Sequence, residues 1–218
     1  SEEKSLSFQL PSWRPGRYEL ADFAKNIQKW NAFDENGNEI PFRKITKDLW
    51  KVNCDGVEEV TVSYNYYANI LDAGSSYLDQ NQLYVNPVNC CMYVVGRENE
   101  KYILELDIPK DYQIACGIKE NNGTLTADNF DILAESPFIA SNSMQYISYE
   151  VEGVTYHIWI QGPCQPNLDK LSADFKTFTI EQVKNFGSLP VDDYHFLFQI
   201  TPYKSYHGVE HTISTVIL

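Results

Sequence analysis

The chain has 218 residues, of which 43% are hydrophobic and 14% aromatic, and its formal net charge is −13 at pH 7. This acidic surplus argues against nucleic-acid binding, which needs basic side chains to neutralise phosphates, and against docking on an anionic membrane surface. No apolar run reaches the roughly 18 residues that a membrane-spanning helix requires. The length suits one large domain or two small ones.

The first predicted element is a strand over residues 6–10. Pro15-Gly16 then favours a type II turn, because glycine accepts the positive φ angle at the third turn position. We expect Trp13 to pack beneath this turn as a core residue, with a substrate contact as the alternative. Residues 20–30 follow as a short helical or irregular segment.

Several turn-forming sequences predict hairpins along the first three quarters of the chain. Asn-Gly and Asp-Gly favour the tight turns that join antiparallel strands, because Asn and Gly tolerate positive φ angles. The predicted strands are residues 27–33 and 39–42 around Asn36-Gly37, 49–52 and 57–67 around Asp55-Gly56, 112–118 and 125 onward around Asn122-Gly123, and 146–151 and 154–160 around Gly153.

Further strands complete this region. Residues 83–95 are predicted as a strand pair or one bulged strand, and residues 101–108 as a strand. Many short strands with frequent turns and little helix indicate an antiparallel β-sandwich or a saddle-like sheet for residues 1–161. The five cysteines lack Cys-x-x-Cys spacing, so we expect reduced, structural thiols.

The character of the sequence changes at residues 162–166, Gly-Pro-Cys-Gln-Pro, which indicate a linker. Asn167 is a favourable N-cap residue, and apolar side chains then recur at intervals of three and four. This pattern predicts an amphipathic helix that ends at Gly187.

Two strands are predicted after this helix, over residues 194–200 and 209–218. A helix with two strands is too small to be stable alone, so it needs the preceding sheet or sequence that follows. The sequence therefore divides into an N-terminal β-sandwich domain (1–161), and a linker with the beginning of a second domain (162–218).

The last stretch, YKSYHGVEHTISTVIL over residues 203–218, carries the main functional candidates. Gly208, Glu210 and His211 precede a β-rich run that continues to Leu218. Folded domains seldom end inside an apolar strand, so we expect the chain to be cut from a longer protein. On residue type alone, a glutamate at the start of a strand is usually a solvated surface residue.

Three stretches, in the same order, resemble the M61 (glycyl aminopeptidase-like) zinc metallopeptidases. They are LPSWRPGRYELADFAKNI near the start, LAESPFIASN in the middle, and HGVEH, which resembles the family's Gly-Gly-x-Glu-His segment. His207 stands where the family usually has its first glycine. The zinc-binding His-Glu-x-x-His of the family occurs nowhere in the 218 residues.

The resemblance implies the N-terminal portion of a zinc-dependent aminopeptidase that removes amino-terminal residues, with a family preference for Gly and Ala. Residues 1–161 would form its N-terminal domain, and residues 162–218 the helix-plus-strands start of a thermolysin-like α+β catalytic domain. The zinc ligands would follow a few dozen residues later. We therefore expect no catalytic residue and no metal ligand in this chain, and no activity from it alone.

The resemblance also implies how a substrate would bind. Glu210 would hold the free amino terminus of a peptide through a charge-assisted hydrogen bond, with Gly208 and His211 beside it. Gly208 would allow close backbone approach, and the peptide would extend along an exposed strand edge. An open C-terminal strand would also promote self-association. The sequence is compatible with a cytoplasmic location and with a periplasmic or secreted one.

The same residues allow alternative functions. A stand-alone β-sandwich that binds a peptide or glycan through its Tyr and Trp side chains is the second hypothesis. His207 and His211 could share a metal only on a helix, which Gly208 and the β-branched residues after His211 oppose. A Ser-His-Asp triad is set aside because the chain contains no Gly-x-Ser-x-Gly elbow.

Overall fold

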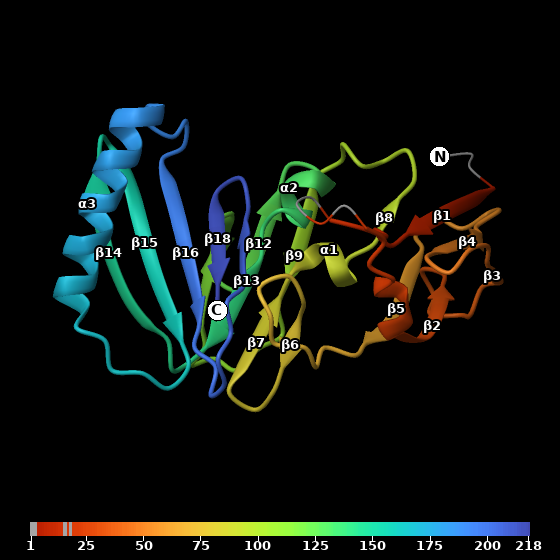
Figure 1. Cartoon of the computed structure of the whole chain (residues 1–218). Coiled ribbons are helices and arrows are strands. Elements are labelled where there is room, and N and C mark those ends of the chain that lie inside the picture. Colours follow the sequence, from red (N-terminus) through yellow and green to blue (C-terminus); the bar gives the residue numbers. More distant parts are fainter. Residues whose placement is uncertain (1–3, 15–16, 18) are drawn as a thin grey trace.

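The computed structural model describes residues 4–14, 17 and 19–218, so the turn predicted at Pro15-Gly16 lies outside the described residues. The described chain is mainly β, as predicted. Its sheets follow one another in a row, from the N-terminal sheet to the long helix near the C-terminal end (Figure 1). None of the described helices combines the length and the apolar character that crossing a bilayer requires.

Two small antiparallel sheets in the N-terminal part surround one aromatic core. Trp30 stacks on Trp50 with ring centroids 5.7 Å apart, and Phe8 meets Trp30 edge-on. One sheet has the strand order β3-β4-β1-β8, and the other pairs β2 with β5. The elements are β1 (Ser5–Gln9), the short 3-10 helix η1 (Phe23–Asn26), β2 (Ile27–Phe33), β3 (Phe42–Lys44), β4 (Leu49–Asn53), β5 (Thr61–Tyr66) and β8 (Tyr93–Val94).

The hairpin predicted at Asn36-Gly37 forms only near its turn, where the N–H of Ile40 donates to the carbonyl oxygen of Ala32. The hairpin predicted at Asp55-Gly56 is wrong, although both turns form. Gly37 and Gly56 both have φ +77°. However, β2 meets Glu39 at one isolated bridge and otherwise pairs with β5, and β4 pairs with β1 and β3. Burying Trp30 and Trp50 in one core brings together strands that are distant in sequence, and this packing overrides the local turn preference.

Two further antiparallel sheets form the middle of the molecule, with the orders β10-β13-β7-β6 and β11-β12-β9. The turn predicted at Asn122-Gly123 is confirmed, but the strand before it is β11. The predicted strand 112–118 contains β10 instead, which pairs with β13. The elements are β6 (Tyr77–Leu78), β7 (Gln82–Val85), α1 (Pro87–Cys90), β9 (Tyr102–Glu105), β10 (Gln113–Cys116), β11 (Lys119–Asn121), β12 (Thr124–Ala127), α2 (Phe130–Ala134) and β13 (Phe138–Ser141).

The interpretation of residues 83–95 as paired or bulged strand is wrong. Pro87 begins a short helix there, because a proline at the first helical position loses no hydrogen bond. As a result, β7 and β8 lie in different sheets.

The C-terminal part forms a mixed five-stranded sheet with the order β14-β15-β16-β18-β17. The hairpin around Gly153 and the amphipathic helix are confirmed: the side chain of Asn167 accepts the backbone N–H of Lys170, and Gly187 ends the helix. This helix connects β15 to β16, which run parallel. The elements are β14 (Gln145–Val151), β15 (Val154–Gln161), α3 (Leu168–Phe186), β16 (Asp193–Gln199), β17 (Gly208–Glu210) and β18 (Ser214–Ile217).

Residues 209–218, predicted as one strand, instead form the hairpin of β17 and β18. The chain turns at residues 211–213, where the N–H of His211 donates to the carbonyl oxygen of Ser214 at 2.8 Å. Ile213 leaves the sheet and packs so closely over Gly117 that a Cβ added there would lie 2.8 Å from its side chain. The turn is therefore stabilised by contacts with the middle sheets.

The five-stranded sheet shares a core with the middle of the molecule. Leu197, Val209 and Val216 pack against Tyr84 and Ile139 on one face, and α3 covers part of the other face (Figure 1). The sheet contains β14 and β15 as well as the strands after residue 161. A division of the chain at 161/162 would therefore cut through one sheet.

Candidate functional site

Glu210 lies at the exposed edge of the five-stranded sheet. It is the last residue of β17, a strand that pairs with β18 alone and so ends the strand order. The register aligns Glu210 with Thr215, and aligned residues of paired strands point to the same face. Val209 points the other way, into the shared core. The carboxylate of Glu210 is therefore presented on the face that α3 partly covers.

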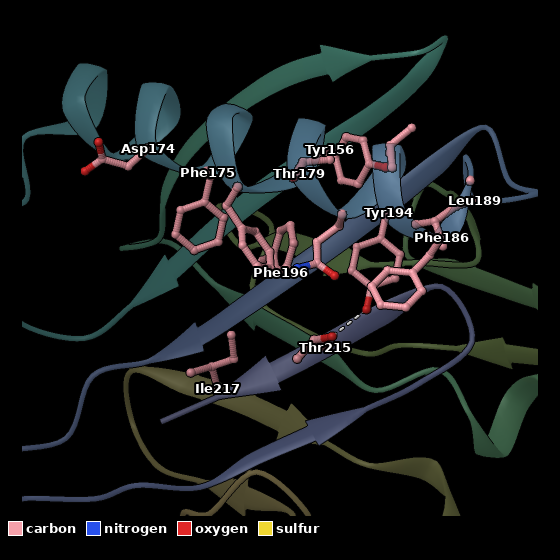
Figure 2. Close-up of a pocket in the computed structure, with 14 residues that line it drawn as sticks. Tyr156, Asp174, Phe175, Thr179, Phe186, Leu189, Tyr194, Phe196, Thr215 and Ile217 are labelled. Atoms are coloured by element: carbon pink, nitrogen blue, oxygen red, sulfur yellow. Dashed lines mark hydrogen bonds between the residues drawn. The ribbon is translucent and has the colours of Figure 1, made fainter.

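A groove of about 800 Å³ lies on this same face, between α3 and strands β16 and β18 (Figure 2). Its lining is apolar and rich in aromatic rings, including Phe175 and Phe186 from the helix and Phe196 from the sheet. Phe186 is 83% exposed. An open apolar surface of this kind marks a place where another chain segment or a ligand packs.

Tyr194 lines the groove and interacts electrostatically with Glu210. Its hydroxyl lies 2.5 Å from Oγ1 of Thr215, the contact drawn as a dashed line in Figure 2. Burial is the main cause that raises the pKa of Tyr194, the hydrogen bond with Thr215 opposes this, and the negative charge of Glu210 raises the pKa further. Tyr194 is thus a neutral phenol within electrostatic reach of the Glu210 carboxylate.

Gly208 begins β17 and is exposed. A Cβ atom added to it would meet only the carbonyl oxygen of Val216, at 3.8 Å. Neighbours within the described chain therefore leave open space beside Gly208, where a ligand backbone or another strand fits.

His211 does not share this edge, although it follows Glu210 directly. Its side chain is only 4% exposed, and its Nδ1 lies 3.4 Å from Oε2 of Glu135. The structure thus brings Gly208 and Glu210 together at the sheet edge and buries His211 behind them, against the residue that follows α2.

The prediction that Trp13 is a core residue is wrong. Trp13 is 51% exposed and lines a cleft of about 820 Å³ between the N-terminal sheet and α2. Trp30 and Trp50 fill the core instead. Glu135 lines the same cleft, and no role was predicted for it from the sequence. The available signal was its place in LAESPFIASN, as a lone carboxylate among small and apolar residues.

The described residues of this chain do not fit a zinc ion. In the described ranges, no group of three or more His, Cys, Asp or Glu side chains could hold a metal. Nδ1 of His207 accepts the N–H of Ala73 at 3.3 Å, and His211 is buried beside Glu135, so the two histidines serve separate contacts.

Comparisons with known proteins place this geometry in context. An aminopeptidase N family protein from Idiomarina loihiensis is 28% identical, with a TM-score of 0.93, over 100% of this chain and 38% of that chain. An M1 zinc metallopeptidase from Deinococcus radiodurans is 11% identical, with a TM-score of 0.55, over 99% of this chain and 52% of that chain. At this low identity the second likeness concerns the fold alone.

The chain spans less than two thirds of the length of both solved structures. No curated protein matches it. The family model described as the Peptidase M61 N-terminal domain matches residues 1–142, well over half of the chain. The chain therefore belongs to the Peptidase M61 N-terminal domain family.

Proposed function

We propose that this chain is the N-terminal portion of a zinc-dependent aminopeptidase, and that Glu210 holds the free amino group of the peptide substrate. The observation that carries the proposal is an exposed carboxylate on the edge strand of a sheet, beside an open apolar groove. Family membership and the likeness to an aminopeptidase N family structure support it.

The geometry suits recognition of an extended peptide by its amino end. The free edge of β17 offers backbone groups for strand-like pairing, and the carboxylate of Glu210 then accepts N–H bonds from the terminal ammonium. The open space beside Gly208 admits the first substrate residue. A preference for small residues such as Gly and Ala belongs to this proposal.

In this proposal, the segment that carries the zinc ligands packs into the groove beside α3. Parallel strands such as β15, β16 and β18 are normally covered on both faces, yet α3 leaves Phe196, Thr215 and Ile217 lining an open groove. When bound by that segment, zinc would polarise the scissile carbonyl and activate water. The residues of this chain bind and orient the substrate, so we expect them to be inactive alone.

The domain division belongs to the same proposal, with a changed boundary. The family match ends at residue 142, and the five-stranded sheet begins at Gln145. We propose that the N-terminal domain ends between these positions rather than at 161/162. The sheet and α3 would then form the start of a thermolysin-like catalytic domain.

The test uses the full-length protein with zinc and a glycyl or alanyl anilide. Glu210→Gln removes the negative charge and should lower kcat/KM roughly 100-fold, in line with a lost charge-assisted hydrogen bond to the ammonium. Glu150→Gln is the matched control, because Glu150 is an exposed glutamate on β14, at the opposite edge of the same sheet. Equal activity of both variants would refute the role of Glu210.

A non-catalytic binding module for a peptide or glycan is the second candidate. The cleft of about 820 Å³ beside the exposed Trp13 favours it, because exposed indole rings are common in binding surfaces. If the full-length protein hydrolyses no anilide, yet titration calorimetry detects peptide or glycan binding that Trp13→Ala abolishes, this candidate replaces the first.

A further inference from the structure

The strand that carries Glu210 is held at both ends by a histidine. β17 has only three residues and pairs on one side only, with β18. Such a short edge strand has few backbone hydrogen bonds to fix it. His207 precedes it and His211 follows it, and both contact residues within 1–142, the part of the chain that matches the family.

His207 anchors the start of β17. Its Nδ1 accepts the backbone N–H of Ala73 at 3.3 Å, which requires this nitrogen to be unprotonated. Asp72, 3.9 Å from the same nitrogen, instead accepts the N–H of Gly74 at 2.7 Å. The buried guanidinium of Arg14 covers Gly74 so closely that an added Cβ would lie 2.3 Å from it. The loop of residues 72–74, to which His207 is hydrogen-bonded, is therefore well packed.

His211 anchors the end of β17 by a different chemistry. Its ring is buried, and neither ring nitrogen makes a hydrogen bond within the described part of the chain. Nδ1 nevertheless lies 3.4 Å from the carboxylate of Glu135, which is 27% exposed. A buried polar ring without a hydrogen bond is costly unless it gains from a nearby charge. The carboxylate of Glu135 is the group placed to supply that gain.

We propose that His211 and Glu135 form a positioning pair that docks the β17–β18 hairpin onto the family-matched part and thereby sets the place of Glu210. His207 is the companion anchor at the other end of the strand. Glu135 acts through His211 and touches no reacting atom. The inference rests on the proposed function, because it assigns the pair an effect on the substrate-binding residue.

The main experiment measures steady-state kinetics of the full-length protein with an alanyl anilide. Glu135→Gln keeps the shape and removes the charge, and should raise KM roughly tenfold while kcat stays within about twofold, the pattern of lost substrate binding. His211→Gln should do the same. The double variant should be no worse than either single variant, because one interaction is removed in all three.

Asp131→Asn is the matched control. Asp131 lies on α2 one helical turn before Glu135 and lines the same cleft. Its substitution should leave both kinetic constants unchanged. An unchanged KM in Glu135→Gln, or effects of the two single variants that multiply in the double variant, would overturn the inference.

Hydrogen exchange on the 218-residue chain gives a second test that needs no activity. Glu135→Gln should speed exchange of the β17 amides several-fold, with β14 and β15 unaffected. If β17 exchange stays at the unsubstituted rate, the pair does not hold the strand. A full-length protein without peptidase activity would defeat the proposed function, whereas this exchange measurement would still decide the inference. Should His211→Gln fail to fold, the isosteric Glu135→Gln variant decides both arms.

Discussion

His195 makes the stability of this fold depend on pH in a calculable way. It lies on β16, is 9% exposed, and accepts the indole N–H of Trp159 on Nδ1 at 3.3 Å. Its ring stacks on that of His157 with centroids 4.4 Å apart. His157 in turn lies 2.8 Å from the carboxylate of Asp193. A proton on Nδ1 of His195 would therefore break the indole hydrogen bond and place a charge in a buried stack.

These surroundings lower the pKa of His195 from 6.5 to about 4, through burial first and the neighbouring His157 second, with Asp193 opposing. In the unfolded chain His195 binds a proton below pH 6.5, whereas in the folded chain it does so only below about pH 4. The stabilisation is therefore complete above pH 6.5 and is lost as the pH falls toward 4. The full effect corresponds to about 3 kcal/mol, of which about 2 kcal/mol is lost by roughly pH 5.

Urea unfolding followed by tryptophan fluorescence, at neutral pH and near pH 5, measures this effect. His195→Gln keeps an acceptor for Trp159 and cannot titrate. The difference in unfolding free energy between the original chain and this variant should shrink by about 2 kcal/mol on acidification. Phe196→Leu, the neighbouring substitution on β16, should show the same difference at both pH values. A difference for His195→Gln that does not change with pH would refute the reasoning.

Two further predictions concern the backbone and the open edge. Gly162→Ala should destabilise the chain by roughly 3 kcal/mol or more in urea unfolding, because φ is +111° and an added Cβ would lie 2.4 Å from a backbone carbonyl oxygen. Gly56→Ala, with φ +77° and open space around the added Cβ, should cost only about 1 kcal/mol. Equal costs for the two variants would contradict this account. The 218-residue chain should self-associate through β17 in sedimentation experiments over a wide concentration range. Gly208→Lys should reduce this self-association by placing a charge on the strand edge. If the association persists unchanged in the variant, the chains associate through another surface.

Local sequence patterns predicted the elements whose partners are near in the chain. The turn at Asn122-Gly123, the hairpin at Gly153 and the helix from Asn167 to Gly187 depend on turn chemistry, capping and one apolar stripe, all encoded within about 20 residues. The pairing of β2 with β5 and of β4 with β1 was not predictable in this way. These pairs form because Trp30 and Trp50 stack in a common core, an interaction between residues from different strands that no local window contains.

The candidate site was likewise predictable only in part from local sequence. Glu210 was found through a resemblance carried by consecutive residues, and it does lie exposed on an edge strand. His211, which the resemblance groups with it, has a buried side chain near Glu135, because adjacent residues around a strand end face opposite sides. The contact of His211 with Glu135 joins residues 76 positions apart, and only the folded chain reveals it.

The position of β17 at the edge of the sheet follows from the residue types of the two last strands. β18 carries Ser214 and Val216, both fully buried, and lies between β16 and β17. β17 carries an exposed glycine and an exposed glutamate. Were β17 to pair directly with β16, Gly208 and Glu210 would take the inner position that the buried Ser214 and Val216 now fill, and less apolar surface would be buried there. Instead, β17 lies at the edge, and the more apolar β18 occupies the inner position beside β16. The same strand order leaves a charged residue on an open edge, which is the arrangement on which the proposed binding of a peptide amino terminus depends.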